Sequence, residues 1–152
     1  MQAFPHIYAV SAPARNAGNV TLRSPQLPDL PSAPPEQFGG PGDLWSPESL
    51  FCAALADCFA LTFRAVSRAA RFEWRTLECR VDGTLESVER VAQFTRFVTS
   101  ARLVVPAGSD VDRARELLER AEHGCLIANS VRGTRMLQSE VIVEAAHVSA
   151  PA

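Results

Sequence analysis

The sequence contains no lysine, because all fifteen of its basic residues are arginines in a chain of 152 residues. This absence excludes a Schiff-base lysine and the lysine of a phosphate-binding loop. The net charge is only −2, so composition gives no reason to expect a nucleic acid as a partner. No two of the four cysteines have the spacing of a zinc knuckle or a thioredoxin motif. Any redox pair must therefore join cysteines that are distant in the sequence.

Hydrophobic runs suited to targeting or membrane insertion are also missing. The first twenty residues include His6 and Arg15 and no long apolar stretch, so we expect no secretory signal. The most apolar segment, residues 50–70, carries Asp57 and Arg64, which make it a poor membrane span. We therefore expect a cytoplasmic protein with reduced cysteines and no membrane partner.

The remaining pattern is typical of one globular domain over residues 1–152, with 47% hydrophobic and 21% charged residues. The expected elements are strands at 4–12 and 19–23, a proline- and glycine-rich loop at 24–45, a helix from 46, strands at 77–82 and 97–105, a helix from 109 or 110 to Gly124, and a strand at 136–146. The order ββ-α-ββ-α-β indicates the α+β class. We expect strands from both ends of the chain to share a sheet.

The first helix has the clearest start signal in the sequence. Ser46 suits the N-cap position, Pro47 the first helical position and Glu48 the first turn. The residues that follow are apolar around almost the whole helix, so we expect burial on all sides. One chain of this length has little material to cover such a helix, which favours a second copy packed against it.

Glu48 cannot reach Cys58 along one straight helix, because ten residues correspond to a rise of about 15 Å. Contact between the two needs a sharp bend or a second copy that packs antiparallel. The simpler interpretation is that Glu48 complements the helix dipole.

Two cysteines have surroundings that favour chemistry. Cys58 lies in the apolar helix beside Asp57, and Cys125 follows the expected end of the second helix, where free N–H groups favour a thiolate. Inert packing is the alternative for each. His123 could activate Cys125 for acyl transfer or could be an exposed histidine at a helix end. No ligand spacing is present, so we assign no metal and no cofactor.

The helix start Ser46-Pro47-Glu48, a Cys58-Phe59 pair ten residues after the glutamate, and a Cys125 motif about 67 residues later are together similar to a known pattern. They resemble the OsmC/Ohr family of bacterial thiol peroxidases. The resemblance covers nearly the whole chain, including the order of its elements. It implies two intertwined α+β subunits that form a homodimer, with buried central helices and a site at the subunit interface.

The resemblance also implies a mechanism. Cys58 as a thiolate attacks an organic hydroperoxide and becomes a sulfenic acid, which condenses with Cys125 to a disulfide. An external dithiol, a lipoyl group in the best-known members, then reduces the pair. Glu48 matches the family glutamate that orients an arginine beside the reactive thiolate. Arg15 is the nearest candidate for that arginine, and Arg23 is the second choice.

The sequence departs from the family pattern at several positions. Leu126 and Ala128 replace the usual proline and serine, and Arg15 lacks glycine neighbours. Asp57 stands where a small neutral residue is common, and a carboxylate facing Cys58 would oppose thiolate formation. These departures leave an alternative, in which a dimer with the same fold binds a hydrophobic small molecule without turnover.

Overall fold

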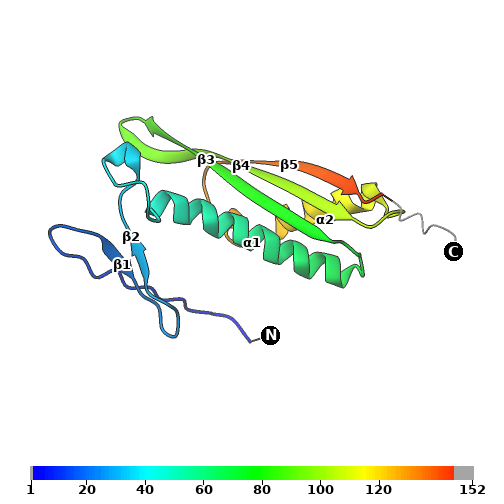
Figure 1. Ribbon diagram of the computed structural model, residues 1–152, viewed down its shortest axis with the longest axis horizontal. Helices are drawn as coiled ribbons and strands as arrows, with labels where there is room; N and C mark the ends of the chain where they lie inside the picture. Colours follow the sequence, from blue (N-terminus) through cyan, green and yellow to red (C-terminus); the bar gives the residue numbers. More distant parts are fainter. Residues whose placement is uncertain (1, 146–152) are drawn as a thin grey trace, which may run out of the picture. The chain divides into compact units, whose positions relative to one another are not determined.

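The computed structural model describes residues 2–145, which group into two compact units with their boundary between Phe51 and Cys52 (Figure 1). The elements follow the order β1, β2, α1, β3, β4, α2 and β5, with two short 3-10 helices between them. The α+β class and the ββ-α-ββ-α-β order are therefore confirmed. That residues 1–152 form a single domain stays a prediction, and each unit is described separately below.

The N-terminal unit contains a small antiparallel sheet. Strand β1 (Val20–Leu22) pairs with β2 (Leu30–Ser32). The expected strand at 4–12 is wrong, because only Ser11 forms an isolated bridge, to Arg23, and the apolar side chains around it are exposed. The expected loop at 24–45 is also wrong in part, since it contains β2 and a 3-10 helix (Glu36–Phe38). Proline is tolerated in β2 because the sheet has only two strands, and both are edges.

Helix α1 (Pro47–Ala69) begins where the sequence predicts. The Ser46 hydroxyl accepts a hydrogen bond from the Ser49 backbone N–H at 3.2 Å, while Ser49 Oγ accepts one from the Ser46 N–H at 2.8 Å. This reciprocal pair satisfies two backbone donors at the helix start. By length and composition alone α1 could also cross a membrane, a property that it shares with core helices of soluble proteins.

Only one face of α1 is buried by its own chain. That face repeats every four residues, and its buried members are Leu55, Phe59, Phe63 and Ser67. Leu61, on another face, is 49% exposed. The expected burial on all sides is therefore wrong for a single chain, because one sheet can cover only one face of a helix.

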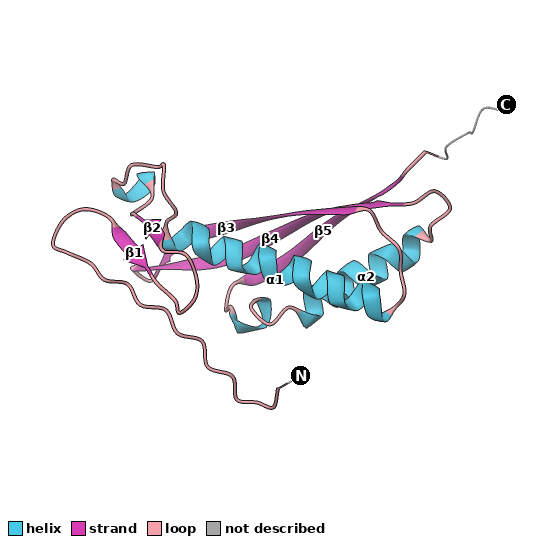
Figure 2. Cartoon of the chain, turned by 60° about the horizontal axis from the view of Figure 1, so that its bottom comes forward, coloured by secondary structure: helices cyan, strands magenta, loops and turns pink. Residues whose placement is uncertain are grey.

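The C-terminal unit contains a three-stranded sheet in the order β3-β4-β5. Strand β3 (Thr76–Val88) is antiparallel to β4 (Val91–Val105), and β5 (Thr134–Val143) runs parallel to β4. Both helices lie on the same face of this sheet (Figure 2). Strands from the two ends of the chain form separate sheets, so the expectation that they share one is wrong. Position 146, the expected end of the last strand, lies outside the described residues.

Helix α2 (Val111–Gly124) begins with the Asp110 side chain accepting a hydrogen bond from the Arg113 N–H at 2.9 Å. Its buried stripe contributes Leu117 and Leu118 to the main core, together with residues of α1 and β4. The helix ends at Gly124, as predicted, but this glycine has another role. A Cβ there would lie 3.3 Å from Cγ2 of Thr62, so the missing side chain lets α1 and α2 approach closely.

Candidate functional site

The fold brings Cys58 of α1 next to Cys125, which directly follows α2. Cys58 packs against the buried cluster that contains Cys125, and neither sulfur is in a disulfide. After burial, the neighbouring Cys58 side chain is among the smaller contributions that raise the pKa of Cys125. Two thiols about 67 residues apart in the sequence are therefore neighbours in the fold.

Cys125 is almost fully buried, with 1% of its surface exposed. It packs in a small cluster with Leu55, Phe97 and Ala128, against which Cys58 also packs. Burial raises the pKa of Cys125 to about 11, although the Ala128 N–H donates to its sulfur at 3.5 Å and favours the thiolate. The sequence predicts free backbone N–H groups here that favour a thiolate, and the Ala128 N–H is one of them. Desolvation has the larger effect, so the Cys125 thiol stays protonated at neutral pH.

Cys58 is only partly buried, and it lines an open cavity of about 600 Å³ on the outer face of α1. We call this cavity the Cys58 groove. Its lining residues are Ala54, Asp57, Cys58, Leu61, Thr62 and Ala65 of α1, with Gly124, Leu126 and Ile127. A small molecule in the groove meets Cys58 first, and Cys125 lies behind it. The arrangement suits a two-thiol reaction in which only the first sulfur contacts the substrate.

The segment that carries Cys125 is held by a polar cluster that sequence reasoning missed. The Asn129 side-chain amide donates to the His123 carbonyl at 3.0 Å, and its oxygen accepts from Arg135 at 3.1 Å. Arg135 also lies 3.8 Å from the Glu122 carboxylate. The Cys125 motif includes Asn129 and so offered a signal for it. No sequence signal pointed to Arg135, because its contact with Asn129 depends on where β5 lies in the fold.

The cysteine–histidine alternative has little geometric support. His123 is exposed, whereas Cys125 is buried. The polar contact made by His123 in this segment is through its backbone carbonyl, which accepts from Asn129. The site therefore does not favour a Cys125–His123 nucleophile for acyl transfer.

Glu48, Arg15 and Arg23 belong to the N-terminal unit, so the structure does not test their relation to the thiols. Arg15 and Arg23 line one cavity of about 370 Å³. Arg23 donates to Asp29 at 3.0 Å, whereas no ion pair of Arg15 is found within residues 2–145. Glu48 Oε2 is buried and has no hydrogen-bond partner among the same residues.

The other two cysteines lie in the C-terminal unit. Burial raises the pKa of Cys79 to about 11, with smaller contributions from the Glu122 carboxylate and Cys125. Burial also raises the pKa of Cys52 against the opposing effect of a hydrogen bond from the Gly83 backbone. Cys79 packs against the main core.

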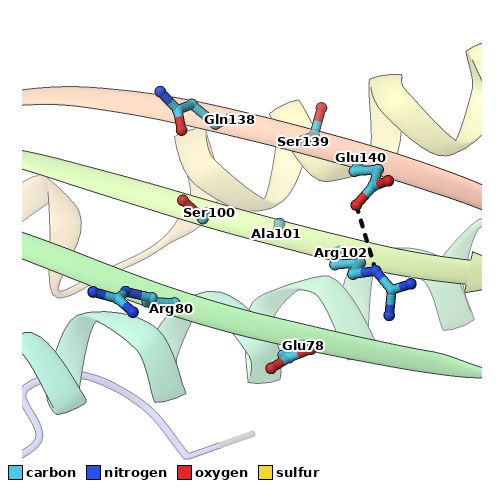
Figure 3. A pocket seen from close by; sticks show the side chains of 8 residues that line it. All are labelled: Glu78, Arg80, Ser100, Ala101, Arg102, Gln138, Ser139 and Glu140. Carbon is cyan, nitrogen blue, oxygen red and sulfur yellow. Dashed lines mark ion pairs between the residues drawn. The ribbon is translucent and has the colours of Figure 1, made fainter.

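A second hollow, of about 400 Å³, lies on the outer face of the three-stranded sheet (Figure 3). Its side chains are mostly polar, and Arg102 pairs with Glu140 of the next strand at 3.4 Å. Glu78 of β3 is the cross-strand neighbour of Arg102, on the side away from β5. No cysteine or histidine lines the hollow, so it offers neither a thiol nor an imidazole base. Within residues 2–145 there is also no group of three or more His, Cys, Asp or Glu residues that could hold a metal ion.

Comparison with known proteins gives a consistent result. The model of a family described as OsmC-like protein matches residues 40–138. A curated relative, the uncharacterized protein YmaD of Bacillus subtilis, is 25% identical over 113 residues, which cover 72% of this chain and 75% of that protein.

Solved structures show the same fold at low identity. An OsmC-like protein of unknown function from Vibrio cholerae has a TM-score of 0.82 and 16% identity, covering 90% of this chain and 100% of its own. An organic hydroperoxide resistance protein from Elizabethkingia anophelis has a TM-score of 0.72 and 21% identity, covering 93% and 100%. One from Legionella pneumophila has a TM-score of 0.69 and 24% identity, covering 91% and 100%.

Proposed function

The chain belongs to the OsmC-like protein family, and on that basis we propose that it is a thiol peroxidase that reduces organic hydroperoxides to alcohols. Two of its structural neighbours carry the name organic hydroperoxide resistance protein. The observation that carries the proposal is the neighbouring pair of thiols, with Cys58 open to an apolar groove and Cys125 buried in the cluster against which Cys58 packs.

In the first step, the Cys58 thiolate attacks one oxygen of the hydroperoxide. An S–O bond forms as the O–O bond breaks, and the alkoxide leaves and takes up a proton to become the alcohol. Sulfur loses two electrons and the peroxide gains them, which leaves a sulfenic acid on Cys58. The apolar side chains of the groove, including Leu61 and Ile127, would hold the organic part of the substrate.

In the second step, the Cys125 sulfur attacks the Cys58 sulfenic acid. An S–S bond forms, and the hydroxyl leaves as water together with the Cys125 proton. The packing of Cys58 against the cluster that contains Cys125 places the two side chains side by side for this step. An external dithiol, such as a lipoyl group on a partner protein, then reduces the disulfide and closes the cycle in the cytoplasm.

Glu48 and Arg15 are proposed to assist Cys58. A guanidinium beside the thiolate would stabilise it and donate hydrogen bonds to the peroxide. A buried carboxylate oxygen without a partner is costly, and an arginine would relieve that cost at Glu48. Arg15 suits this role better than Arg23, because Arg23 is already paired with Asp29.

The active form is proposed to be a homodimer. The outward face of α1 is apolar, with Leu61 nearly half exposed, and a second copy of the helix would cover part of it. The same copy would complete the site, because Glu48 and Cys58 of one chain are separated by ten residues of helix.

The test is consumption of cumene hydroperoxide in the presence of a dithiol. The wild-type protein is expected to reduce it catalytically, and Cys58→Ser is expected to lose this activity while keeping its fold by circular dichroism. If the wild type is no faster than Cys58→Ser, the enzyme hypothesis fails.

One observation favours a second candidate, a dimer that binds a hydrophobic small molecule without turnover. Asp57 lines the groove next to Cys58, and no arginine or histidine is among the described residues that line it. Intact thiols after peroxide treatment, together with a co-purified ligand, would support this candidate over the peroxidase.

A further inference from the structure

Asp57 is the one charged side chain among the described residues that line the Cys58 groove. The other lining residues are apolar or small, apart from Thr62 and Cys58 itself. No arginine or histidine is among them, and no ion pair of Asp57 is found within residues 2–145. Among the described residues that line it, the groove therefore carries a single charge, which is negative and lies one residue from the thiol that opens into it.

The position of Asp57 on α1 keeps this charge within the groove. On an α-helix, residues three and four apart share a face, so Asp57 follows Ala54 and precedes Leu61 on one stripe. Both of these neighbours line the groove as well. A substrate that reaches Cys58 over the apolar stripe must therefore pass close to the Asp57 carboxylate.

A like charge on the substrate raises the free energy of that approach, whereas a neutral group is hardly affected. The interaction is strongest where apolar walls exclude water, and it is screened by salt because Asp57 is exposed. Charge selection at such a site acts on the rate of reaction at Cys58.

We propose that Asp57 makes the Cys58 groove selective for neutral and cationic substrates over anionic ones. On the proposed function, on which this inference rests, the preferred substrates are uncharged or positively charged organic hydroperoxides. Hydroperoxides that carry a carboxylate near the reacting oxygen are disfavoured.

The first test does not depend on peroxidase activity. Iodoacetamide and iodoacetate alkylate a thiolate by the same reaction, in which a C–S bond forms and iodide leaves, but only iodoacetate is negatively charged. Their rates at Cys58 are measured by peptide mass spectrometry in the wild type, Asp57→Asn and Asp57→Arg. Glu78→Gln is the matched control, since it removes one negative charge from the outer face of the sheet (Figure 3).

The ratio of the iodoacetamide rate to the iodoacetate rate is expected to fall about three- to tenfold in Asp57→Asn and further in Asp57→Arg. High salt should reduce the difference between the wild type and Asp57→Asn, and Glu78→Gln should keep the wild-type ratio. An unchanged ratio in both Asp57 variants would overturn the proposal. So would an equal fall in Glu78→Gln, because that would trace the effect to net charge.

The second test uses cumene hydroperoxide and its para-carboxylate, which share one skeleton. The wild type is expected to prefer the neutral compound in kcat/KM, and Asp57→Asn is expected to lose most of that preference. If both compounds are reduced and the ratio of their kcat/KM values is the same in the wild type and Asp57→Asn, the charge selection is wrong. The proposed peroxidase activity then still stands. Reduction of neither compound overturns the peroxidase, and the alkylation ratio then decides the role of Asp57 alone.

Discussion

Both faces of α1 carry apolar residues, but they differ in what covers them. The inner face packs Phe59 and Phe63 into a core shared with β4 and α2. The outer face presents Ala54, Leu61 and Ala65 to the Cys58 groove. Apolar residues thus serve stability on one side of the helix, and on the other they surround the Cys58 sulfur.

Cys58 and its partner show why this difference matters. Cys58 packs against the cluster that contains the buried Cys125, yet it also lines the groove. A thiol at this boundary is reachable from solvent while its partner is protected. The comparison therefore predicts that substitutions on the outer face change chemistry, and that substitutions on the inner face change stability.

The largest effect is expected from Cys125→Ser, which removes the protected thiol and keeps the exposed one. Cys58 should still react with one equivalent of hydroperoxide, but its sulfenic acid can no longer form the intramolecular disulfide. Turnover with a dithiol should fall about a hundredfold or more. The readouts are steady-state peroxide consumption and trapping of the Cys58 sulfenic acid with dimedone. Full turnover in Cys125→Ser would exclude Cys125 from the cycle.

The next effect concerns stability and contrasts Phe63→Ala with Leu61→Ala. Phe63 is fully buried, so its truncation should lower the free energy of unfolding by about 3–5 kcal/mol. Leu61 is 49% exposed in one chain, and its truncation should cost less than about 1 kcal/mol there. Urea unfolding at low protein concentration measures both. Equal losses would show that the two faces are equally buried in solution.

The order of elements and the inner faces of the strands were predictable from sequence. Alternation predicts that Phe97 and Leu103 point inward, and both are buried. A serine–proline pair marks the start of α1, and the structure confirms it. These features depend on neighbours in the chain, so local patterns suffice for them.

The features that failed depend on distant partners. Apolar alternation around Ile7 predicts a strand, but a strand also needs a neighbour to bond, and Ile7 is 90% exposed. The meeting of Cys58 and Cys125 was implied by family resemblance, since no local pattern measures a distance across 67 residues. Arg135, which holds Asn129 from β5, was missed for the same reason.

A charge at Leu61 sharpens the comparison by testing what covers the outer face. Leu61→Arg should leave the secondary structure of one chain intact, because the side chain is half exposed. If a second copy packs over this face, the buried charge should weaken dimerisation at least about tenfold. Analytical ultracentrifugation of the wild type, Leu61→Arg and the exposed-helix control Glu119→Gln measures this. A wild-type monomer would contradict the proposed dimer.

The smallest expected effect is a loss of folding stability at alkaline pH, which reports on the burial of Cys125. Burial raises the pKa of Cys125 from 9.0 to about 11, so the folded state keeps a proton that the unfolded state loses. Stability should therefore be unaffected by this group below about pH 9 and should fall as the pH rises from 9 to 11, by up to about 2 kcal/mol. Cys79, whose pKa is also raised to about 11, contributes in the same direction. Urea unfolding at pH 8, 9, 10 and 11 measures the slope, and Cys125→Ala should reduce it without removing it. If Cys125→Ala keeps the wild-type dependence of stability on pH, the Cys125 thiol is hydrated in solution and not protected by burial.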